Sequence, residues 1–169
     1  MTGHLPNDLQ ISDSEFEEIW KEKPNEKLKI KMLGKEVECP RWTQMFGRSY
    51  KFSGLNHKCV KLKGLGGFEK TGALVEKLVE HSNNLFGKDF NAGLVNWYSP
   101  KGTIGYHSDD EKDLKPSSEI VSFTFGCCRD FYLKNKETGE VKKYLLENNS
   151  ICVMGGDCQK EFKHSVPQM

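Results

Sequence analysis

The sequence predicts a mostly β fold of the α+β class, in which N-terminal helices pack on one sheet of a jelly-roll-like double sheet. Two observations carry this prediction. Helical patterns occur only before residue 87, and short strand patterns follow them at roughly 8–12-residue spacing, divided by turn signals. The chain has 169 residues, which suits one domain with a short extension rather than two full domains.

Two helices are predicted in the front half. Residues 12–15 read Ser-Asp-Ser-Glu, a capping box, and apolar residues follow it at helical spacing. This first helix is expected to end near Lys23-Pro24. The second helix covers residues 71–86, where one apolar stripe runs along the segment and Gly87 serves as the C-cap.

The strand predictions rest on alternation and on turn residues. Residues 28–32 alternate with period two, and Gly34 marks the turn after them. Behind the second helix, five strands are expected, at residues 93–98, 119–126, 131–134, 141–146 and 150–154. We accordingly divide the chain into residues 1–27, an N-terminal arm (loose over 1–11) with a short helix, and residues 28–169, the main domain.

Composition excludes several classes of protein. The chain holds 25 basic and 24 acidic residues, so its net charge of +1 gives no global attraction to nucleic acid or to an anionic membrane. No apolar run reaches the length of a membrane span and no signal peptide is visible, so we expect a monomer of the nucleus or cytoplasm that is not secreted. Six cysteines are then expected to be reduced thiols.

Local charge is more informative than net charge. Between Arg41 and Lys70 the chain has seven basic residues and one acidic residue, Glu69. A basic segment of a neutral protein can track phosphates, and an ordinary solvated lysine face explains the same pattern equally well. Charge alone leaves these two interpretations open.

The segment Gly105-Tyr106-His107-Ser108-Asp109 carries the clearest chemistry. On a strand, His107 and Asp109 point to the same side and can bind one metal ion, with His164 as a third ligand from further along the chain. Two histidines and one carboxylate on one face of an octahedral ion are used by non-haem Fe(II) oxygenases. An isolated His-x-Asp pair is more often a surface feature, but Asn96 and Tyr98 on a nearby strand can donate to an anionic cosubstrate.

Several short blocks, in the same order and at the same spacing, resemble the AlkB family of Fe(II)/2-oxoglutarate-dependent nucleic-acid demethylases. The blocks are Asn96-Trp97-Tyr98, the His107–Glu111 segment, residues 121–131 (VSFTFGCCRDF) and His164-Ser165-Val166-Pro167. The branch with the human AlkB homologues 2 and 3 is the most similar, and Leu33-Gly34-Lys35, Pro40-Arg41 and residues 50–55 (YKFSGL) look like its substrate-side elements. The resemblance covers about residues 30–169 and implies a double-stranded β-helix (jelly-roll) core.

The resemblance also implies a role for each matching residue. His107, Asp109 and His164 would be the catalytic iron ligands, and Asn96 and Tyr98 would bind 2-oxoglutarate. The remaining positions would contact the substrate: Tyr50, Lys51 and Phe52 on a base-gripping hairpin, Asp110 and Glu111 near the exocyclic amine of the flipped base, and Arg41 and Lys35 along the substrate side.

The expected activity is oxidative demethylation of 1-methyladenine and 3-methylcytosine in DNA or RNA, as DNA repair. It would use Fe(II), O2 and 2-oxoglutarate and release formaldehyde and succinate. Both lesions are cations, so aromatic faces and the carboxylates of Asp110 and Glu111 suit them. A methyl group on a Watson–Crick nitrogen is unreachable inside a duplex, so the base must be flipped or unpaired.

One part of the family pattern does not occur in the sequence. The family continues beyond the distal histidine into a last core strand with two arginines, whereas only five residues follow His164, and Arg41, Arg48 and Arg129 occupy other positions. The last core strand is therefore expected to be missing, and weak or no turnover is expected. The alternatives are a catalytically impaired AlkB-like nucleic-acid-binding module and a 2-oxoglutarate hydroxylase with a non-nucleic-acid substrate. A zinc site of Cys152, Cys158 and His164 is a minor alternative because no CxxC pair occurs.

Overall fold

The structure is a computed structural model of the chain, and it describes all residues except 48–50, 53–54, 57–58, 61–65, 110–113 and 115–118. The chain forms two compact units. The first combines residues 1–11 with residues 100–169, and the second covers residues 12–99. Over the described residues, no helix combines the length and apolar character that a membrane crossing requires.

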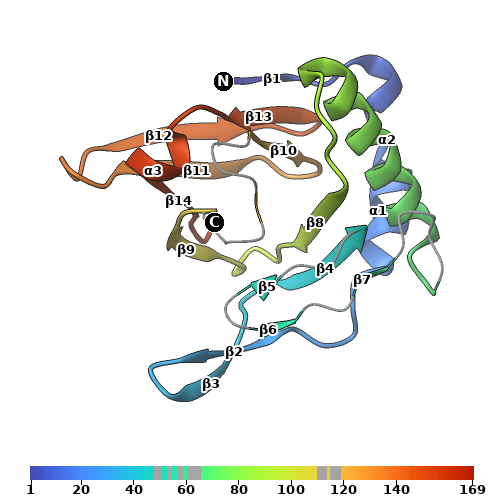
Figure 1. The fold of residues 1–169 in the computed structure, drawn as a ribbon. Coiled ribbons are helices and arrows are strands. Elements are labelled where there is room, and N and C mark those ends of the chain that lie inside the picture. The colour runs from blue at the N-terminus through green and yellow to red at the C-terminus, as the bar shows by residue number, and fades with distance from the viewer. Residues whose placement is uncertain (48–50, 53–54, 57–58, 61–65, 110–113, 115–118) are drawn as a thin grey trace. The chain divides into compact units, whose positions relative to one another are not determined.

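The first unit contains two antiparallel sheets (Figure 1). One has the strand order β1-β13-β10, and the other has the order β12-β11-β14-β9. The strands of the three-stranded sheet are β1 (Thr2–His4), β10 (Ile120–Thr124) and β13 (Ser150–Met154). Those of the four-stranded sheet are β9 (Ile104–His107), β11 (Arg129–Asn135), β12 (Val141–Leu146) and β14 (Phe162–Val166). A one-turn helix, α3 (Cys158–Glu161), leads from β13 into β14.

The apolar core of this unit lies between its two sheets. Phe131 and Leu146 contribute from the four-stranded sheet, and Cys152 and Met154 contribute from the three-stranded sheet. All four side chains are at most 6% exposed. Alternation of buried and partly buried positions along β13 matches a strand with one face on a core. The two-sheet arrangement and the few helices confirm the predicted mostly β, jelly-roll class.

The N-terminal residues differ from the prediction of a loose arm over residues 1–11. Strand β1 pairs antiparallel with β13, from Thr2 opposite Cys152 to His4 opposite Ser150. The short 3-10 helix η1 (Asn7–Leu9) follows, and Leu5 and Leu9 are buried. A strand of three residues is too short to show an apolar alternation in the sequence. Its position depends instead on hydrogen bonds to the backbone of β13. The predicted division at residues 27 and 28 stays a prediction.

The second unit carries both long helices. The capping box at the start of α1 (Asp13–Lys21) is confirmed: the Glu15 N–H donates to Ser12 Oγ (3.3 Å), and the Ser12 N–H donates to Glu15 Oε2 (2.8 Å). Helix α2 (Glu69–Phe86) ends at Gly87, whose φ of 59° is the left-handed conformation predicted for a C-cap. Gly93 allows α2 to approach its sheet closely, since a Cβ there would lie 2.9 Å from Val75 Cγ1.

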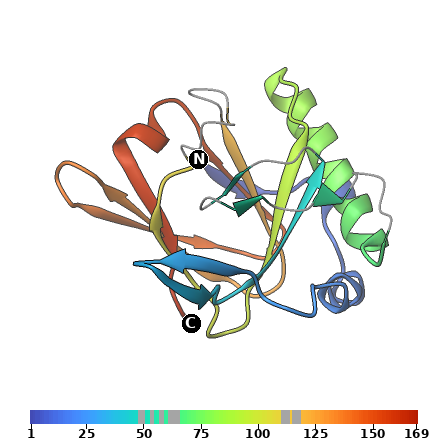
Figure 2. The ribbon, with the colours of Figure 1, turned by 60° about the horizontal axis from the view of Figure 1, so that its bottom comes forward.

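Strands of the second unit form one three-stranded sheet, with the order β7-β4-β8, and two separate ribbons, β2-β3 and β5-β6 (Figure 2). Helix α2 packs against β8 of the sheet. The sheet strands are β4 (Trp42–Gly47), β7 (Cys59–Val60) and β8 (Ala92–Trp97). The ribbon strands are β2 (Lys29–Met32), β3 (Lys35–Glu38), β5 (Lys51–Phe52) and β6 (Leu55–Asn56).

Candidate metal centre

Three metal-ligating side chains converge in the first unit. His107 is the last residue of β9, Asp109 lies two residues later, and His164 is in the middle of β14. Antiparallel pairing places His164 directly opposite His107. One ligand atom from each residue lies within 4.8 Å of the others, and no other such group of His, Cys, Asp and Glu occurs among the described residues.

The donor atoms of this group face one another. Asp109 Oδ1 lies 3.5 Å from His107 Nε2, and Asp109 Oδ2 lies 3.4 Å from His164 Nε2. His107 Nδ1 lies 2.9 Å from the Gly105 carbonyl oxygen. Because a carbonyl oxygen only accepts, Nδ1 carries the proton in this bond, and the lone pair of the neutral ring is on Nε2. Lone pairs and carboxylate oxygens that face one another in this way fit a cation, and the backbone-oriented histidine is typical of a metal ligand.

Burial keeps the His164 ring neutral. Its side chain is in the core, and desolvation, helped by the neighbouring His107, lowers its pKa from 6.5 to about 4. For Asp109, burial by itself raises the carboxyl pKa, but the neighbouring rings of His107 and His164 outweigh it, and the net pKa is lowered. At neutral pH the group therefore offers a neutral His164 imidazole and an ionised Asp109 carboxylate, the protonation states that metal binding requires.

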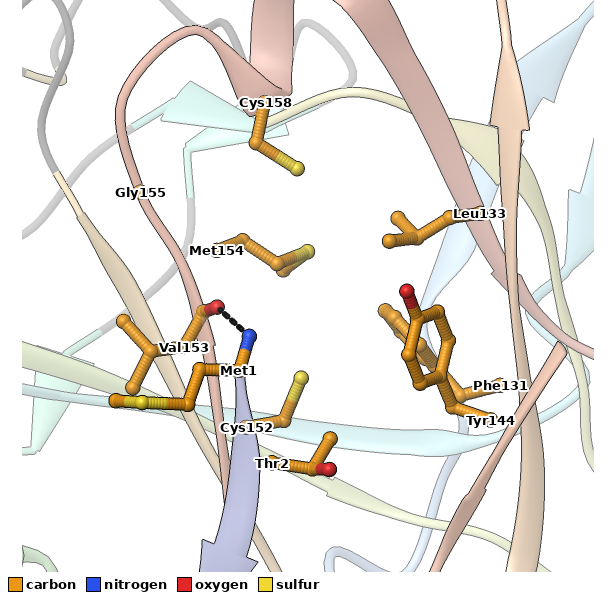
Figure 3. Close-up of a pocket in the computed structure, with 10 residues that line it drawn as sticks. All are labelled: Met1, Thr2, Phe131, Leu133, Tyr144, Cys152, Val153, Met154, Gly155 and Cys158. Carbon is orange, nitrogen blue, oxygen red and sulfur yellow. Dashed lines mark hydrogen bonds between the residues drawn. The ribbon is translucent and has the colours of Figure 1, made fainter. Parts of the chain in front are cut away.

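The Phe131 ring connects the metal centre to a neighbouring cavity that is partly open. It stacks on His164, with ring centroids 5.6 Å apart and planes at 29°. It also lines a cavity of about 210 Å³ between the two sheets of the first unit. No lining residue in the described chain has a charged side chain. The side chains from the two sheets and from α3 meet across this cavity (Figure 3): Phe131, Leu133, Tyr144, Cys152, Met154 and Cys158.

Hydrogen bonds near the centre tie β9 to β14. Ser108 Oγ donates to the Phe162 carbonyl (2.9 Å), and Thr103 Oγ1 donates to the Val166 carbonyl (2.6 Å). Sequence reasoning singled out neither residue. In the sequence, Ser108 is marked only by its place beside the predicted ligand His107, and Thr103 only by its place just before β9. Their partners are backbone carbonyls, which cannot be identified from the sequence.

The predicted cosubstrate residues lie in the second unit. Asn96 is on β8, and Tyr98 follows the last residue of that strand. Asn96 Oδ1 accepts a hydrogen bond from Arg41 Nε (3.0 Å), and Arg41 is only 4% exposed. Arg41 therefore orients the Asn96 amide, an interaction that the sequence did not reveal. The predicted roles of Asn96, Tyr98 and Arg41 toward ligands stay predictions.

The predicted substrate-side residues are described only in part. Lys35 is exposed at the start of β3. Lys51 and Phe52 form β5, which pairs with β6, but their side chains are outside the described part of the structure. Tyr50, Asp110 and Glu111 also lie outside the described residues.

The cysteines do not form the zinc site weighed above. Cys152 and Cys158 both line the cavity, but the described residues contain no metal-ligating group that joins them to His164. Burial raises the pKa of both thiols. Protonated buried thiols are poor ligands and poor nucleophiles, so these side chains act as small apolar groups of the core.

Comparisons with known proteins agree with this centre. The sequence profile of the 2OG-Fe(II) oxygenase superfamily matches residues 10–169. The DNA oxidative demethylase ALKBH2 of Mus musculus is 30% identical over 151 residues, 82% of this chain and 59% of that protein. The alpha-ketoglutarate-dependent dioxygenase alkB homolog 3 of Rattus norvegicus is 33% identical over 92 residues, 48% of this chain and 31% of that protein.

The fold is also similar to a solved one. The structure of OsALKBH1 superimposes with a TM-score of 0.59 at 17% identity, covering 99% of this chain and 85% of that chain. Together these similarities confirm the resemblance to the AlkB family predicted from the motifs. The chain spans between 51% and 59% of the length of the mammalian ALKBH2 proteins that it matches.

Proposed function

The chain belongs to the 2OG-Fe(II) oxygenase superfamily, and on this basis we propose that it is an Fe(II)- and 2-oxoglutarate-dependent dioxygenase that demethylates alkylated bases in nucleic acid. The observation that carries the proposal is the convergence of His107, Asp109 and His164 into one group of facing donor atoms. Similarity to proteins named DNA oxidative demethylase supports the substrate class.

In this proposal, His107 Nε2, His164 Nε2 and Asp109 would hold the metal ion. The Gly105 carbonyl holds His107 in the required tautomer, and stacking on Phe131 fixes the plane of His164. When bound, Fe(II) with 2-oxoglutarate and O2 supplies the oxidising chemistry. The two neutral imidazoles and one carboxylate leave a net positive charge at the site, which favours an anionic keto acid over water.

Asn96 and Tyr98 are proposed to orient the cosubstrate. An amide N–H and a phenol O–H are good donors to the carboxylates of 2-oxoglutarate. Arg41 supports this role, because its Nε donates to Asn96 Oδ1 and so fixes which end of the Asn96 amide is the oxygen. The Asn96 amide nitrogen, on the other side, is then the end proposed to donate to the cosubstrate. Arg41 is then a support for Asn96 more than a contact of the substrate.

The substrate in this proposal is a cationic methylated base that has left its stack. Tyr50, Lys51, Phe52, Asp110 and Glu111 are proposed to hold it, through aromatic faces, a lysine near the phosphates and carboxylates near the exocyclic amine. Lys35 lies on the exposed β2-β3 ribbon, where Leu33 at the tip is 101% exposed. Exposed apolar side chains flanked by lysines are suited to contact bases beside a phosphate backbone.

The reaction inserts one oxygen atom into the N-methyl C–H bond and the other into the keto acid, which loses CO2 to give succinate. The hydroxymethyl group then gives its hydroxyl proton to water and leaves as formaldehyde, while the electron pair of the broken C–N bond stays on the base nitrogen and restores the neutral base. The chain's own contribution is to bind, orient and exclude water. Action on DNA would take place in the nucleus.

The test is repair of an oligonucleotide that contains one 1-methyladenine, followed by mass spectrometry of the base and of succinate. We expect a slow loss of 14 mass units from the base, in line with the weak turnover expected from the sequence, in a reaction that needs both Fe(II) and 2-oxoglutarate. The Asp109→Ala variant should be inactive, while a change of the exposed Lys160, whose side chain bonds only to Asp157 among the described residues, should leave activity unchanged.

The other outcomes separate the alternatives. Tight binding of the methylated oligonucleotide without succinate formation would favour the impaired binding module. Succinate formation that is unaffected by the oligonucleotide would favour a hydroxylase with a different substrate. Either result would contradict the proposed demethylase.

A further inference from the structure

A glutamine side chain contacts the metal centre from outside the ligand set. Gln159 lies on the one-turn helix α3, five residues before His164. Its Oε1 accepts a hydrogen bond from the backbone N–H of Asp109 (2.9 Å). The Gln159 side chain thus holds the main chain of Asp109, the candidate ligand that follows β9.

The orientation of the Gln159 amide is determined by this bond. A backbone N–H only donates, so the atom that faces Asp109 must be the amide oxygen. The amide nitrogen then points to the other side, where Nε2 donates to the sulfur of Met154 (3.8 Å). Met154 is 5% exposed and belongs to the apolar core, so the Gln159 side chain is held at both ends.

The main chain of Gln159 is held as well. Lys136 Nζ donates to the Gln159 carbonyl oxygen (2.7 Å), which ties α3 to the turn after β11. Ser108, between the two ligands His107 and Asp109, donates to the Phe162 carbonyl just after α3. The residues after β9 are therefore bonded to α3 and to the start of β14, and Gln159 provides the bond that reaches Asp109 itself.

Asp109 needs such a bond more than the histidines do. His107 and His164 are both in paired strands, and they lie opposite each other in the register. Asp109 lies beyond the end of β9. Its backbone N–H has no ladder partner among the described strands and is satisfied by Gln159 instead.

We propose that Gln159 is a positioning residue of the metal centre, which holds the main chain of Asp109 so that the carboxylate faces both histidines. This role rests on the proposed function, since it presumes that the three side chains bind a metal. It assigns no contact between Gln159 and the metal or the substrate. Loss of the amide oxygen would leave the Asp109 carboxylate free to turn away and would lower the affinity for metal.

The experiment measures Co(II) binding to the full chain by isothermal titration calorimetry and by the visible absorption spectrum. Gln159→Leu removes both hydrogen bonds at similar size, and Gln159→Glu keeps an acceptor for the Asp109 N–H. Gln168→Leu is the matched control, because the Gln168 side chain also bonds a backbone atom, the Lys101 carbonyl oxygen, and is exposed. Hydrogen exchange of the Asp109 amide in the metal-free protein reports on the bond itself.

We expect Gln159→Leu to weaken Co(II) binding by roughly 10–100-fold, to alter the visible spectrum and to speed exchange of the Asp109 amide. Gln159→Glu keeps an acceptor for the Asp109 N–H but loses the donor to Met154, so its Co(II) affinity should lie between those of the wild type and Gln159→Leu. Gln168→Leu should change nothing. Wild-type affinity in Gln159→Leu, with a faster-exchanging Asp109 amide, would overturn the positioning role alone. Absence of Co(II) binding in the wild type would overturn the metal centre and the role with it.

Should Gln159→Leu fail to fold, Met154→Leu replaces it. This substitution conserves volume and removes only the partner of Gln159 Nε2. We then expect a smaller but measurable loss of Co(II) affinity with an unchanged melting temperature. Equal affinities of Met154→Leu, Gln159→Glu and the wild type would overturn the proposal.

Discussion

The properties of individual residues in this protein depend on where burial and backbone atoms place them. His164 is an ordinary histidine by sequence, but desolvation in the core makes it a neutral ligand at physiological pH. Arg129, one of three arginines, is 9% exposed and bonds backbone carbonyls on either side of the β9-β14 pair. Neither property can be recognised from the residue type alone.

The neutral His164 predicts a pH-dependent stability of the metal-free protein. The pKa of His164 is 6.5 when unfolded and about 4 when folded, so the unfolded chain takes up the proton first as pH falls. The contribution of this residue is complete above about pH 6.5 and is lost as pH falls to about 4, up to about 3 kcal/mol. Urea midpoints measured between pH 7 and pH 4 check this.

The control is His164→Asn, whose side chain does not titrate. Its stability should change less with pH over the same range, although its absolute stability is lower. Identical pH dependence of the variant and the wild type would show that His164 is not buried and neutral.

Arg129 is expected to be essential for stability. Its Nη2 donates to the Gly102 carbonyl (2.7 Å) and to the Pro167 carbonyl (2.6 Å), which precede β9 and follow β14. Arg129→Met leaves both carbonyls without this donor, and a loss of roughly 2–4 kcal/mol in unfolding free energy is expected. Chemical denaturation measures it, and a loss below about 0.5 kcal/mol, the level of an ordinary surface change, would contradict this account.

At the scale of elements, several ends are completed by residues from a neighbouring element. Helix α2 has no side-chain cap from its own N-cap residue, Phe68. The C-cap residue of α1, Glu22, supplies one: its carboxylate accepts from the Lys70 N–H (2.8 Å), the Thr71 N–H (2.7 Å) and Thr71 Oγ1 (2.6 Å). One residue thus ends α1 and caps α2, and couples the two helices.

Removal of this cap has a predictable cost. Glu22→Ala deprives the first turn of α2 of an anionic acceptor, and we expect a loss of about 1–2 kcal/mol. Glu18→Ala is the matched control, since within the described part of the chain Glu18 forms only an exposed ion pair with Lys70 (3.2 Å), and its loss should cost well under about 1 kcal/mol. Thermal unfolding of both variants measures the difference, and equal losses would refute the capping role.

The tip of the β2-β3 ribbon shows a second effect at this scale. Leu33 and Gly34 form a two-residue loop in which both φ angles are positive, 49° and 77°. Such a loop favours Asn-Gly, and a leucine in this conformation is strained. Leu33→Asn should therefore stabilise the protein by about 1 kcal/mol.

The same variant tests the nucleic-acid side of the proposed function. If the exposed Leu33 side chain contacts bases, Leu33→Asn should bind a methylated oligonucleotide more weakly while its melting temperature rises. Fluorescence anisotropy measures the binding. Unchanged binding by the stabilised variant would exclude the ribbon tip from the interface.

At the scale of the whole molecule, the first unit is built from both ends of the chain. Residues 1–11 pack with residues 100–169, and β1 extends the three-stranded sheet at β13. The Leu5 N–H donates to the Asn149 carbonyl (2.9 Å), and the Leu5 side chain is 3% exposed. The N-terminal segment is therefore part of the core of the unit that holds the metal centre.

This arrangement predicts a large effect from a small N-terminal change. Leu5→Ala should cost roughly 2–4 kcal/mol, as for other buried leucines. His4→Ala, one residue earlier and exposed, is the control and should cost little. Chemical denaturation distinguishes the two, and equal stabilities would restore the loose arm that the sequence predicted.

Local patterns were enough to predict several elements and to single out the candidate metal ligands. The capping box at Ser12, the Gly87 C-cap and the strands at residues 141–146 and 150–154 were all recognisable, because each depends on residues close together in the chain. The three metal-binding candidates were recognisable for a related reason, since few residue types serve as metal ligands.

Tertiary structure alone decided the partners of these elements. Three contacts show this: β1 pairs with β13, Arg41 bonds to Asn96, and Gln159 bonds to the backbone of Asp109. Each joins residues at least 50 positions apart in the sequence. The burial that keeps His164 neutral likewise depends on the assembled sheets. A backbone N–H or carbonyl is the same in every residue and carries no sequence signal. Such contacts exist only once the sheets have assembled, so the hydrogen bonds that position Asn96 and Asp109 could not be predicted from the sequence.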